Sequence, residues 1–256
     1  MPRAVRLLVV VLALLAVTVA GCRRGPKGQV KIAAASDLAK AFEEIGREYT
    51  KRTGVKPVFT FGSSGLLAKQ IAEGAPFDLY AAANIKFVDE TVAAGSCDGA
   101  TRKPYARGRI VAWSASQKIA SLADLADPRF GKVAIAHPEH APYGKAAKEA
   151  LEAAGVWAQV QPKLVLAENI RQTLQWAQEG SADAAIVALS LAPVDEGGRS
   201  LLVDEKLHRP LVQALVVCKH GGHAANAQAF ADFVMSPEGS AIMKRYGFSL
   251  PDSPSE

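Results

Sequence analysis

Apolar residues recur along this chain with two spacings, one typical of strands and one typical of helices. Short apolar runs predict strands at residues 30–35, 55–61, 78–82, 109–113, 132–136, 163–166, 184–188 and 211–218. Between them, apolar residues at helical spacing, such as Leu38, Phe42, Ile45 and Tyr49, predict helices. Further helices are expected at residues 65–74, 85–94, 143–154, 169–179, 224–235 and 237–246. Strands that alternate with helices indicate an α/β protein with largely parallel sheets.

The domain organisation follows from the number of these elements. One sheet could hold them all, but the chain is long for it, and two α/β lobes with a ligand cleft between them fit better. We place the crossings between the lobes near residues 107–109 and 210–214. The first lobe then comprises residues 29–107 and 214–256, and the second comprises residues 108–213.

The N-terminal segment has the features of an export signal. Arg3 and Arg6 precede an apolar run at residues 7–20, which ends in Gly21 and Cys22. A helix that spans a bilayer needs about 20 apolar residues, so this run is short for a membrane span.

The end of this segment is more specific. Residues 19–22 (VAGC) resemble the bacterial lipobox, in which the cysteine becomes the acylated first residue of the mature protein. We therefore predict a lipoprotein signal peptide at residues 1–21, lipidation of Cys22 and a polar tether at residues 22–28. The alternative is an uncleaved signal anchor with an incidental cysteine.

Composition and charge exclude several classes of protein. The 256 residues include 30 Lys and Arg and 25 Asp and Glu, a net charge of +5, and loss of Arg3 and Arg6 would leave +3. A charge this small, without a basic and aromatic stripe, argues against a nucleic-acid partner. The apolar fraction of 49% excludes a disordered chain, and three cysteines are too few for a disulfide scaffold.

Two serines stand where strands run into helices. Ser36 follows the strand at 30–35, and Ser64 follows the strand at 55–61 within a glycine-flanked turn. Ligands of open α/β sheets bind at the carboxyl ends of strands, and a helix N-terminus offers free N–H groups to an anion. We interpret Ser36 and Ser64 as candidate donors to an oxyanion, the alternative being that each serine only caps its helix.

A third candidate element is the loop at residues 137–144 (HPEHAPYG), between a predicted strand and a predicted helix. Two prolines stiffen it, and the phenol of Tyr143 is a possible donor at the start of the helix. The alternative is an ordinary proline-rich turn whose tyrosine packs on a neighbour.

Together these segments resemble the periplasmic molybdate-binding proteins of ABC transporters. The resemblance runs from about residue 30 to the C-terminus. It rests on the order and spacing of residues 33–38 (AAASDL), 61–65 (FGSSG), 74–79 (GAPFDL), 138–144 (PEHAPYG), 168–170 (ENI), 187–190 (VALS) and 245–248 (RYGF). It implies a two-lobed fold of the type II periplasmic-binding-protein class. Each lobe would be a mixed, largely parallel sheet flanked by helices, and the lobes would close on molybdate or tungstate.

The resemblance also implies a set of ligand positions. The family's two serine ligands fall on Ser36 and Ser64, and the ligand of the second lobe's loop falls on Tyr143, through the hydroxyl in a tyrosine-bearing subgroup. A further position falls on Ile170, which would donate its backbone N–H. The last falls on Ala188, a tyrosine in some members, and alanine has no hydroxyl to offer.

Asp37 lies beside Ser36, where a carboxylate directed into the cleft would repel a dianion. We expect its side chain to point outward and to favour the helix N-terminus instead. A site made only of hydroxyl and N–H donors satisfies a fully deprotonated oxyanion and penalises hydrogen phosphate, whose proton finds no acceptor.

The resemblance implies partners and a location as well. The protein would deliver its ligand to an ABC permease of the inner membrane, as a periplasmic or extracytoplasmic monomer held on the membrane by its lipid. It implies no catalysis, no cofactor and no nucleic acid, and molybdenum only within the bound oxyanion.

Two other readings remain open at this point. The first is an exported serine hydrolase or phosphate-ester enzyme that uses Ser64, which would need a base and an acidic partner that the sequence does not suggest. The second is a metal site at Cys218, His220 and His223, less favoured than a strand end with two surface histidines. Cys97 and Cys218 would form either a disulfide or two separate buried thiols.

Overall fold

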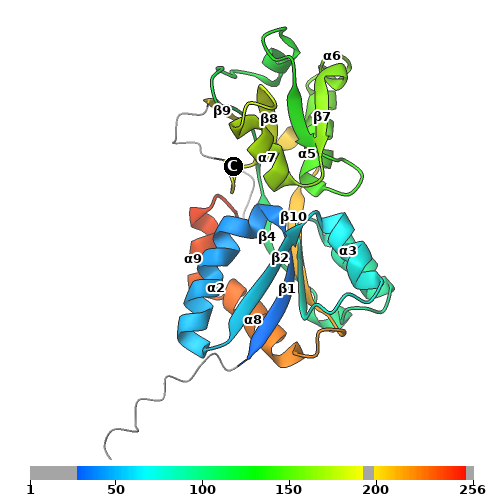
Figure 1. Cartoon of the computed structure of the whole chain (residues 1–256), viewed down its shortest axis with the longest axis vertical. Helices are drawn as coiled ribbons and strands as arrows, with labels where there is room; N and C mark the ends of the chain where they lie inside the picture. The colour runs from blue at the N-terminus through cyan, green and yellow to red at the C-terminus, as the bar shows by residue number, and fades with distance from the viewer. Residues whose placement is uncertain (1–27, 193–198, 252–256) are drawn as a thin grey trace, which may run out of the picture.

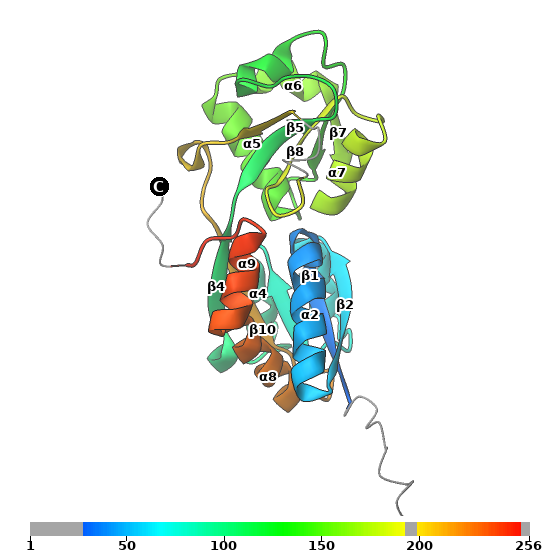
Figure 2. The same cartoon turned by 90° about the vertical axis from the view of Figure 1, so that its left-hand side faces the viewer.

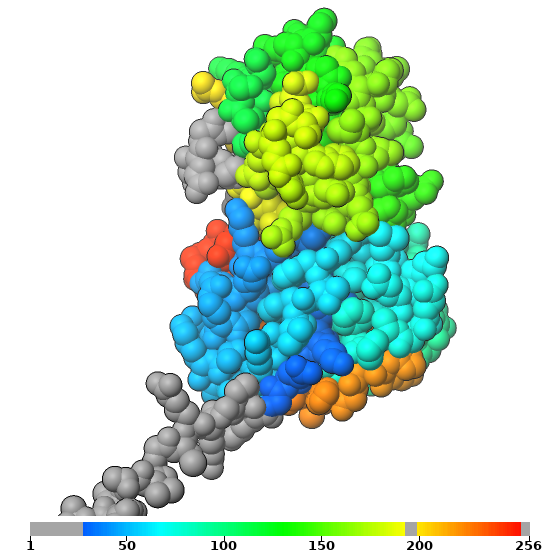
Figure 3. Space-filling view, viewed as in Figure 1, coloured from blue at the N-terminus to red at the C-terminus, as the bar shows by residue number. Residues whose placement is uncertain are grey.

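The computed structural model describes residues 28–192 and 199–251, which form two lobes, each built on a five-stranded sheet. Figure 1 shows the lobes one above the other, the lower one blue, cyan and orange and the upper one green and yellow. On the face drawn in Figure 3, atoms of the two lobes are in contact. Within the described residues, no helix has both the length and the apolar character needed to cross a membrane.

The sheet of the first lobe has the strand order β2-β1-β3-β10-β4. The strands are β1 (Gln29–Ala35), β2 (Lys56–Gly62), β3 (Leu79–Ala82), β4 (Lys103–Gly108) and β10 (Leu211–Val217). β1 pairs in parallel with β2 and β3, whereas β10 is antiparallel to β3 and β4. Pro57 lies in the edge strand β2, where a residue without an N–H donor is tolerated.

The sheet of the second lobe has the strand order β7-β6-β8-β5-β9. The strands are β5 (Ile110–Ser114), β6 (Val133–Ala136), β7 (Leu164–Ala167), β8 (Ala184–Ala188) and β9 (Arg199–Leu202). β6 is parallel to β7 and β8, and β5 is antiparallel to β8 and β9. Each sheet therefore has as many antiparallel as parallel strand pairs, whereas we expected largely parallel sheets. The antiparallel strands β5 and β10 follow a connection from the other lobe rather than a βαβ crossover, which would make them parallel to their neighbours.

Two chain segments connect the lobes. β4 ends at Gly108 and β5 begins at Ile110, so the first crossing is at Arg109, and Figure 2 shows the chain rising from β4 into β5. The chain returns through residues 203–210, and β10 then pairs with β4 from Leu211 onward. Residues 211–213, which the sequence analysis assigned to the second lobe, thus belong to the first sheet.

Helices cover both sheets. The first lobe carries α2 (Ala39–Thr53), α3 (Ser64–Ala72), α4 (Ile85–Ala93), α8 (Ala224–Met235) and α9 (Pro237–Arg245), and the second carries α5 (Pro142–Ala153), α6 (Trp157–Val160) and α7 (Ile170–Gln178). Short 3₁₀ segments are η1 (Ser36–Leu38), η2 (Gly99–Thr101), η3 (Leu122–Ala126), η4 (Gln161–Lys163) and η5 (Glu205–Leu207). The predicted apolar face of α2 is confirmed, because Phe42, Ile45 and Tyr49 are buried and the two aromatic rings pack on Phe230 of α8.

A disulfide joins Cys97, after α4, to Cys218, after β10. This pairing resolves the alternative of two separate thiols, and it links segments 121 residues apart in the first lobe. Structural disulfides are typical of compartments outside the cytoplasm, in agreement with the predicted export.

Candidate functional site

Four helix starts lie at the junction between the lobes. η1 follows β1 and runs directly into α2, and α3 follows β2. In the second lobe, α5 and α7 each follow the carboxyl end of a strand, β6 and β7. Because the first N–H groups of a helix have no acceptor within it, such starts attract anions.

Hydrogen bonds between the lobes bring these starts together. Ser36 Oγ at the start of η1 donates to Asn169 Oδ1, the N-cap of α7, at 3.3 Å. The N–H of Gly65 in α3 donates to the carbonyl oxygen of His140, in the loop before α5, at 2.8 Å. A side chain at Gly65 would have its Cβ 2.8 Å from this same oxygen, so glycine permits the close approach.

Ser36 and Ser64 are buried, and neither hydroxyl caps its own helix. The capping alternative is therefore not what the structure shows. Ser64 Oγ accepts a hydrogen bond from the N–H of Ala83 at 3.0 Å, and a hydroxyl that accepts retains its own proton for another acceptor. Tyr80 fixes the same turn through a 2.6 Å bond from its hydroxyl to the carbonyl oxygen of Ser64.

Ile170 begins helix α7, whereas Ala188 ends strand β8, so the two residues offer different groups to a ligand. Asn169 Oδ1 accepts from the N–H groups of Arg171 and Gln172, both at 3.1 Å, whereas Ile170 is the first helical residue, for which α7 supplies no acceptor. Ala188 is buried at the end of β8, and its methyl side chain cannot donate a hydrogen bond.

Asp37 corrects one expectation from the sequence. Its side chain does not point outward: the residue is 1% exposed. Asp37 Oδ2 accepts from the hydroxyl of Tyr143 at 2.9 Å and from Nε2 of Gln213 at 2.6 Å. Ser190 Oγ donates to the Asp37 carbonyl oxygen at 2.8 Å, so both Tyr143 and Ser190 reach this residue from the second lobe.

The packing around Tyr143 explains this orientation. The phenol lies against Gly108 so closely that a Cβ there would come within 2.0 Å of the Tyr143 oxygen. Tyr105 donates to Gln213 Oε1 at 2.8 Å, which turns the amide nitrogen of Gln213 toward Asp37 and Tyr143. Sequence reasoning did not single out Gln213, although a glutamine within the apolar run LVQALVV signals a buried polar partner.

Burial controls the protonation of this cluster. It raises the pKa of Asp37 to about 6, although the hydrogen bonds from Gln213 and Tyr143 act in the opposite direction. It also raises the pKa of Tyr143 and Tyr105 well above the usual value for a phenol, with the nearby Asp37 adding to the effect. Both tyrosines are therefore neutral hydroxyls at neutral pH.

The Tyr143 phenol proton is engaged with Asp37, which bears on the predicted ligand role. Donation of the phenol to an oxyanion stays a prediction, and it requires this hydrogen bond to break. The backbone N–H of Tyr143 lies in the first turn of α5, after Pro142, and offers a second donor at the same residue.

Comparison with known proteins assigns this two-lobed chain to a protein family. Residues 30–249 match the family model of the bacterial extracellular solute-binding proteins. The chain belongs to this family. It is 35% identical to the molybdate-binding protein ModA of Rhodobacter capsulatus over 86% of this chain and 88% of that protein. It is 31% identical to ModA of Escherichia coli K12 over 93% of this chain and 95% of that one.

The solved structures agree. The periplasmic molybdate-binding protein of Azotobacter vinelandii superposes with a TM-score of 0.81 at 29% identity, over 87% of this chain and all of that one. The sulfate-binding protein SubI of Mycobacterium tuberculosis matches with a TM-score of 0.75 at 17% identity, a likeness of fold alone. The resemblance predicted from the sequence segments is confirmed.

The hydrolase alternative for this solute-binding protein is not supported. Ser64 contacts the backbone of Ala83 and the hydroxyl of Tyr80, and no described imidazole or carboxylate is hydrogen-bonded to it. The serine that lies near a histidine is Ser63, 2.9 Å from Nδ1 of His140, and its hydroxyl also donates to the His140 carbonyl oxygen. Burial lowers the pKa of His140, and the contact joins the lobes.

The metal alternative is also not supported. Cys218 is part of the disulfide, and His223 lies 3.3 Å from Oδ1 of the buried Asp78. Among the described residues, no group of three or more His, Cys, Asp and Glu side chains is placed to hold a metal ion.

A cavity of about 530 Å³ lies between the lobes beside α4 and α5, and it reaches the start of α5 at Ala141 and Pro142. Its lining includes Asn84, Phe87, Pro138, Lys145, Glu149 and Arg209, but neither Ser36 nor Ser64. We place the site at the buried helix starts because the neutral donors that suit a small oxyanion are found there.

Proposed function

We propose that this protein is an extracytoplasmic solute-binding protein that captures molybdate, or tungstate, and delivers it to an ABC permease for import. Its family membership and the printed names of its relatives support this function. The observation that carries it is the meeting of four helix starts between the lobes, with Ser36 and Ser64 contributed by one lobe and Tyr143 and Ile170 by the other.

In this proposal the oxyanion accepts hydrogen bonds from the hydroxyls of Ser36 and Ser64 and from the N–H of Ile170. Tyr143 contributes either its phenol or its backbone N–H, and the position of Ala188 contributes shape only. Ser36 exchanges its bond to Asn169 for the ligand, while Asn169 keeps the two N–H donors of α7. A tetrahedral oxyanion presents only oxygen atoms, so no residue of the site touches the metal.

The donor set also accounts for selectivity. Neutral donors satisfy a dianion without a salt bridge, and they leave the proton of hydrogen phosphate without an acceptor. Sulfate has no such proton, so discrimination against sulfate depends on the size of the closed cavity.

A membrane location completes the proposal. Cys22 and the signal at residues 1–21 lie outside the described residues, and we propose that Cys22 is the lipid-bearing first residue of a monomer at the membrane surface. Mass spectrometry of the mature protein from native membranes tests this: an acylated Cys22 supports the anchor, and a different, unmodified N-terminus contradicts it.

A thermal-shift series with molybdate, tungstate, sulfate and phosphate tests the binding function. We expect molybdate and tungstate to raise the melting temperature and phosphate to leave it unchanged. The Ser64→Ala variant should bind molybdate tenfold to a hundredfold more weakly or worse, because a hydrogen bond to a charged group contributes about 1.5–3 kcal/mol.

The matched control is Ser240→Ala in α9 of the first lobe, whose hydroxyl donates to the Met235 carbonyl oxygen. We expect this variant to bind like the parent protein. Equal affinity of the Ser64→Ala variant and the parent would contradict the proposed site, and a parent that responds to none of the oxyanions would contradict the function.

A further inference from the structure

Asp37 lies where the two lobes meet, and it adjoins the proposed ligand Ser36. Side chains from both lobes converge on it: Gln213 from β10 of the first lobe, and Tyr143 and Ser190 from the second. Asp37, Tyr143 and Gln213 are each at most 2% exposed. A carboxyl group in this position takes part in any closure of the lobes around a ligand.

The groups that face this carboxyl group are uncharged. They are the phenol of Tyr143 on α5, the amide of Gln213 on β10 and, behind the amide, the phenol of Tyr105 on β4. The nearest cation in the sequence, Lys40, donates to the carbonyl oxygen of Leu191 at 2.9 Å. An ionised Asp37 is therefore stabilised by two neutral side-chain donors and, to a smaller extent, by its own backbone N–H, against the cost of its burial.

The two oxygens of the carboxyl group differ. Oδ2 accepts both hydrogen bonds, whereas Oδ1 is buried and has no hydrogen-bond partner among the described residues. A buried carboxylate oxygen without a donor is costly, and a proton on Oδ1 removes the charge while both bonds to Oδ2 remain. The geometry thus lets the acid form of Asp37 keep both of its hydrogen bonds.

A bound dianion increases this preference. The proposed ligand oxygens contact Ser36, the residue next to Asp37, and like charges at short range in a buried site disfavour ionisation of the carboxyl group. We propose that Asp37 takes up one proton from solvent, on Oδ1, when the lobes close on the oxyanion, so that capture of the dianion is coupled to protonation of this residue. This inference rests on the proposed function.

The proposal makes a specific statement about Asn at this position. In the Asp37→Asn variant the amide oxygen can accept the two bonds that Oδ2 accepts, and the amide nitrogen takes the place of the protonated Oδ1. The variant therefore imitates the acid form at every pH, and it should bind molybdate without proton uptake.

The experiment is calorimetric titration with molybdate at about pH 7.5, in buffers with different heats of ionisation, which yields the number of protons taken up per ligand bound. We expect close to one proton for the parent and none for Asp37→Asn. From about pH 6.5 to about pH 8, the parent affinity should fall about tenfold per pH unit, while the affinity of the variant stays constant.

Two further variants assign the proton. Asp124→Asn applies the same substitution to a surface carboxylate of the second lobe and should behave like the parent. His140→Gln removes the other titratable group whose contact joins the lobes, and proton uptake should persist in it. Uptake that survives in Asp37→Asn, or that disappears in His140→Gln alone, would overturn the assignment to Asp37.

The remaining outcomes are also decisive. Molybdate binding by the parent without proton uptake would overturn the coupling and leave the proposed function intact, whereas the absence of binding by the parent at any pH would overturn both. If Asp37→Asn does not fold, the ¹³C chemical shift of the Asp37 carboxyl carbon in the parent complex at about pH 7.5 decides between the acid form, which supports the proposal, and the carboxylate, which overturns it.

Discussion

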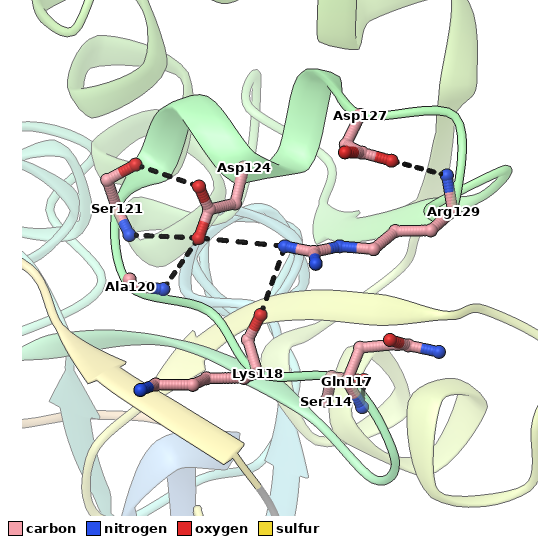
Figure 4. A network of polar contacts seen from close by, with 8 residues as sticks. All are labelled: Ser114, Gln117, Lys118, Ala120, Ser121, Asp124, Asp127 and Arg129. Atoms are coloured by element: carbon pink, nitrogen blue, oxygen red, sulfur yellow. Dashed lines mark hydrogen bonds and ion pairs between the residues drawn. The ribbon is translucent and has the colours of Figure 1, made fainter.

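Asp37 and Asp124 are both aspartates in short 3₁₀ segments, and the structure sets their acidities in opposite directions. Figure 4 shows the surroundings of Asp124 in η3, where its carboxylate accepts from the N–H groups of Ala120 and Ser121 at 2.7 and 3.3 Å and from Ser121 Oγ at 3.2 Å. Arg129 lies 3.7 Å from the same carboxylate. The Ala120 N–H, followed by Ser121 and Arg129, lowers the pKa of Asp124, whereas burial raises the pKa of Asp37.

The opposite pKa shifts of Asp37 and Asp124 show that loss of hydration outweighs hydrogen bonding at the buried residue. Both carboxylates accept good hydrogen bonds, but Asp124 remains in contact with water and Asp37 does not. Two neutral donors do not compensate for the loss of hydration at Asp37, so its charge is costly at neutral pH. The surface aspartate stabilises a turn of the chain, and the buried aspartate connects the two lobes at the proposed binding site.

The largest expected effect is on the pH dependence of stability in the ligand-free protein. The folded-state pKa of Asp37 is about 6, against 3.8 for the ordinary group, so the native state binds more protons than the unfolded state between these values. Stability should therefore fall as pH rises from about 4 to about 6, by about 3 kcal/mol from this group, at about 1.4 kcal/mol per pH unit. Asp37→Asn should remove this decline.

Urea unfolding of the parent and of Asp37→Asn at several pH values measures this effect. We compare the unfolding free energy of the variant minus that of the parent. This difference should be larger at about pH 7.5 than at about pH 4, in favour of the variant. A constant difference in unfolding free energy across the range would contradict a raised pKa at Asp37.

A smaller effect should follow from Gln213→Met, which removes one donor to Asp37 and retains the volume of an unbranched side chain. Since the hydrogen bond from Gln213 lowers the pKa of Asp37, its loss should raise that pKa above about 6. It should also destabilise the fold by about 1–3 kcal/mol, because polar groups of Asp37, Tyr105 and Tyr143 lose a buried partner. NMR titration of the Asp37 carboxyl carbon measures this pKa. An unchanged or lower pKa of Asp37 in the variant would contradict the role given to Gln213.

The smallest effect is expected at the other carboxylate. Asp124→Asn should reduce stability slightly at neutral pH, because the lowered pKa of Asp124 contributes stability that is present above its unfolded value and lost as pH falls. The deficit should disappear in acid, which is the opposite sign to Asp37→Asn. Urea unfolding over the same pH series measures how the effect of each substitution on the unfolding free energy changes with pH. A change of the same sign for the two variants would contradict this contrast between Asp37 and Asp124.

The sequence was informative where the signal is local. Ser36, Ser64 and Ile170 could be placed at helix starts because a strand, a turn residue and a periodic apolar run follow one another within a few positions. The orientation of Asp37 could not be predicted, since it depends on Gln213, 176 residues away, and on the space that Gly108 leaves for Tyr143.

The same distinction holds for the fold. The alternation of strands and helices and the two lobes were predicted, but β4 (KPYARG) and β9 (RSLL) were missed because these strands carry polar residues without a long apolar run. The pairing of β10 with β4 was not predicted, and the disulfide of Cys97 and Cys218 was only one of two alternatives, because both depend on contacts between distant parts of the chain.

The central claim is that molybdate binds between the lobes at the four helix starts. Crystals of the molybdate complex, measured above and below the molybdenum absorption edge, locate the metal directly. We predict a single anomalous peak within hydrogen-bonding reach, through its oxygens, of Ser36 Oγ, Ser64 Oγ and the N–H of Ile170. A peak elsewhere, such as in the cavity beside α4 and α5, or the absence of any peak at saturating molybdate, would contradict the account.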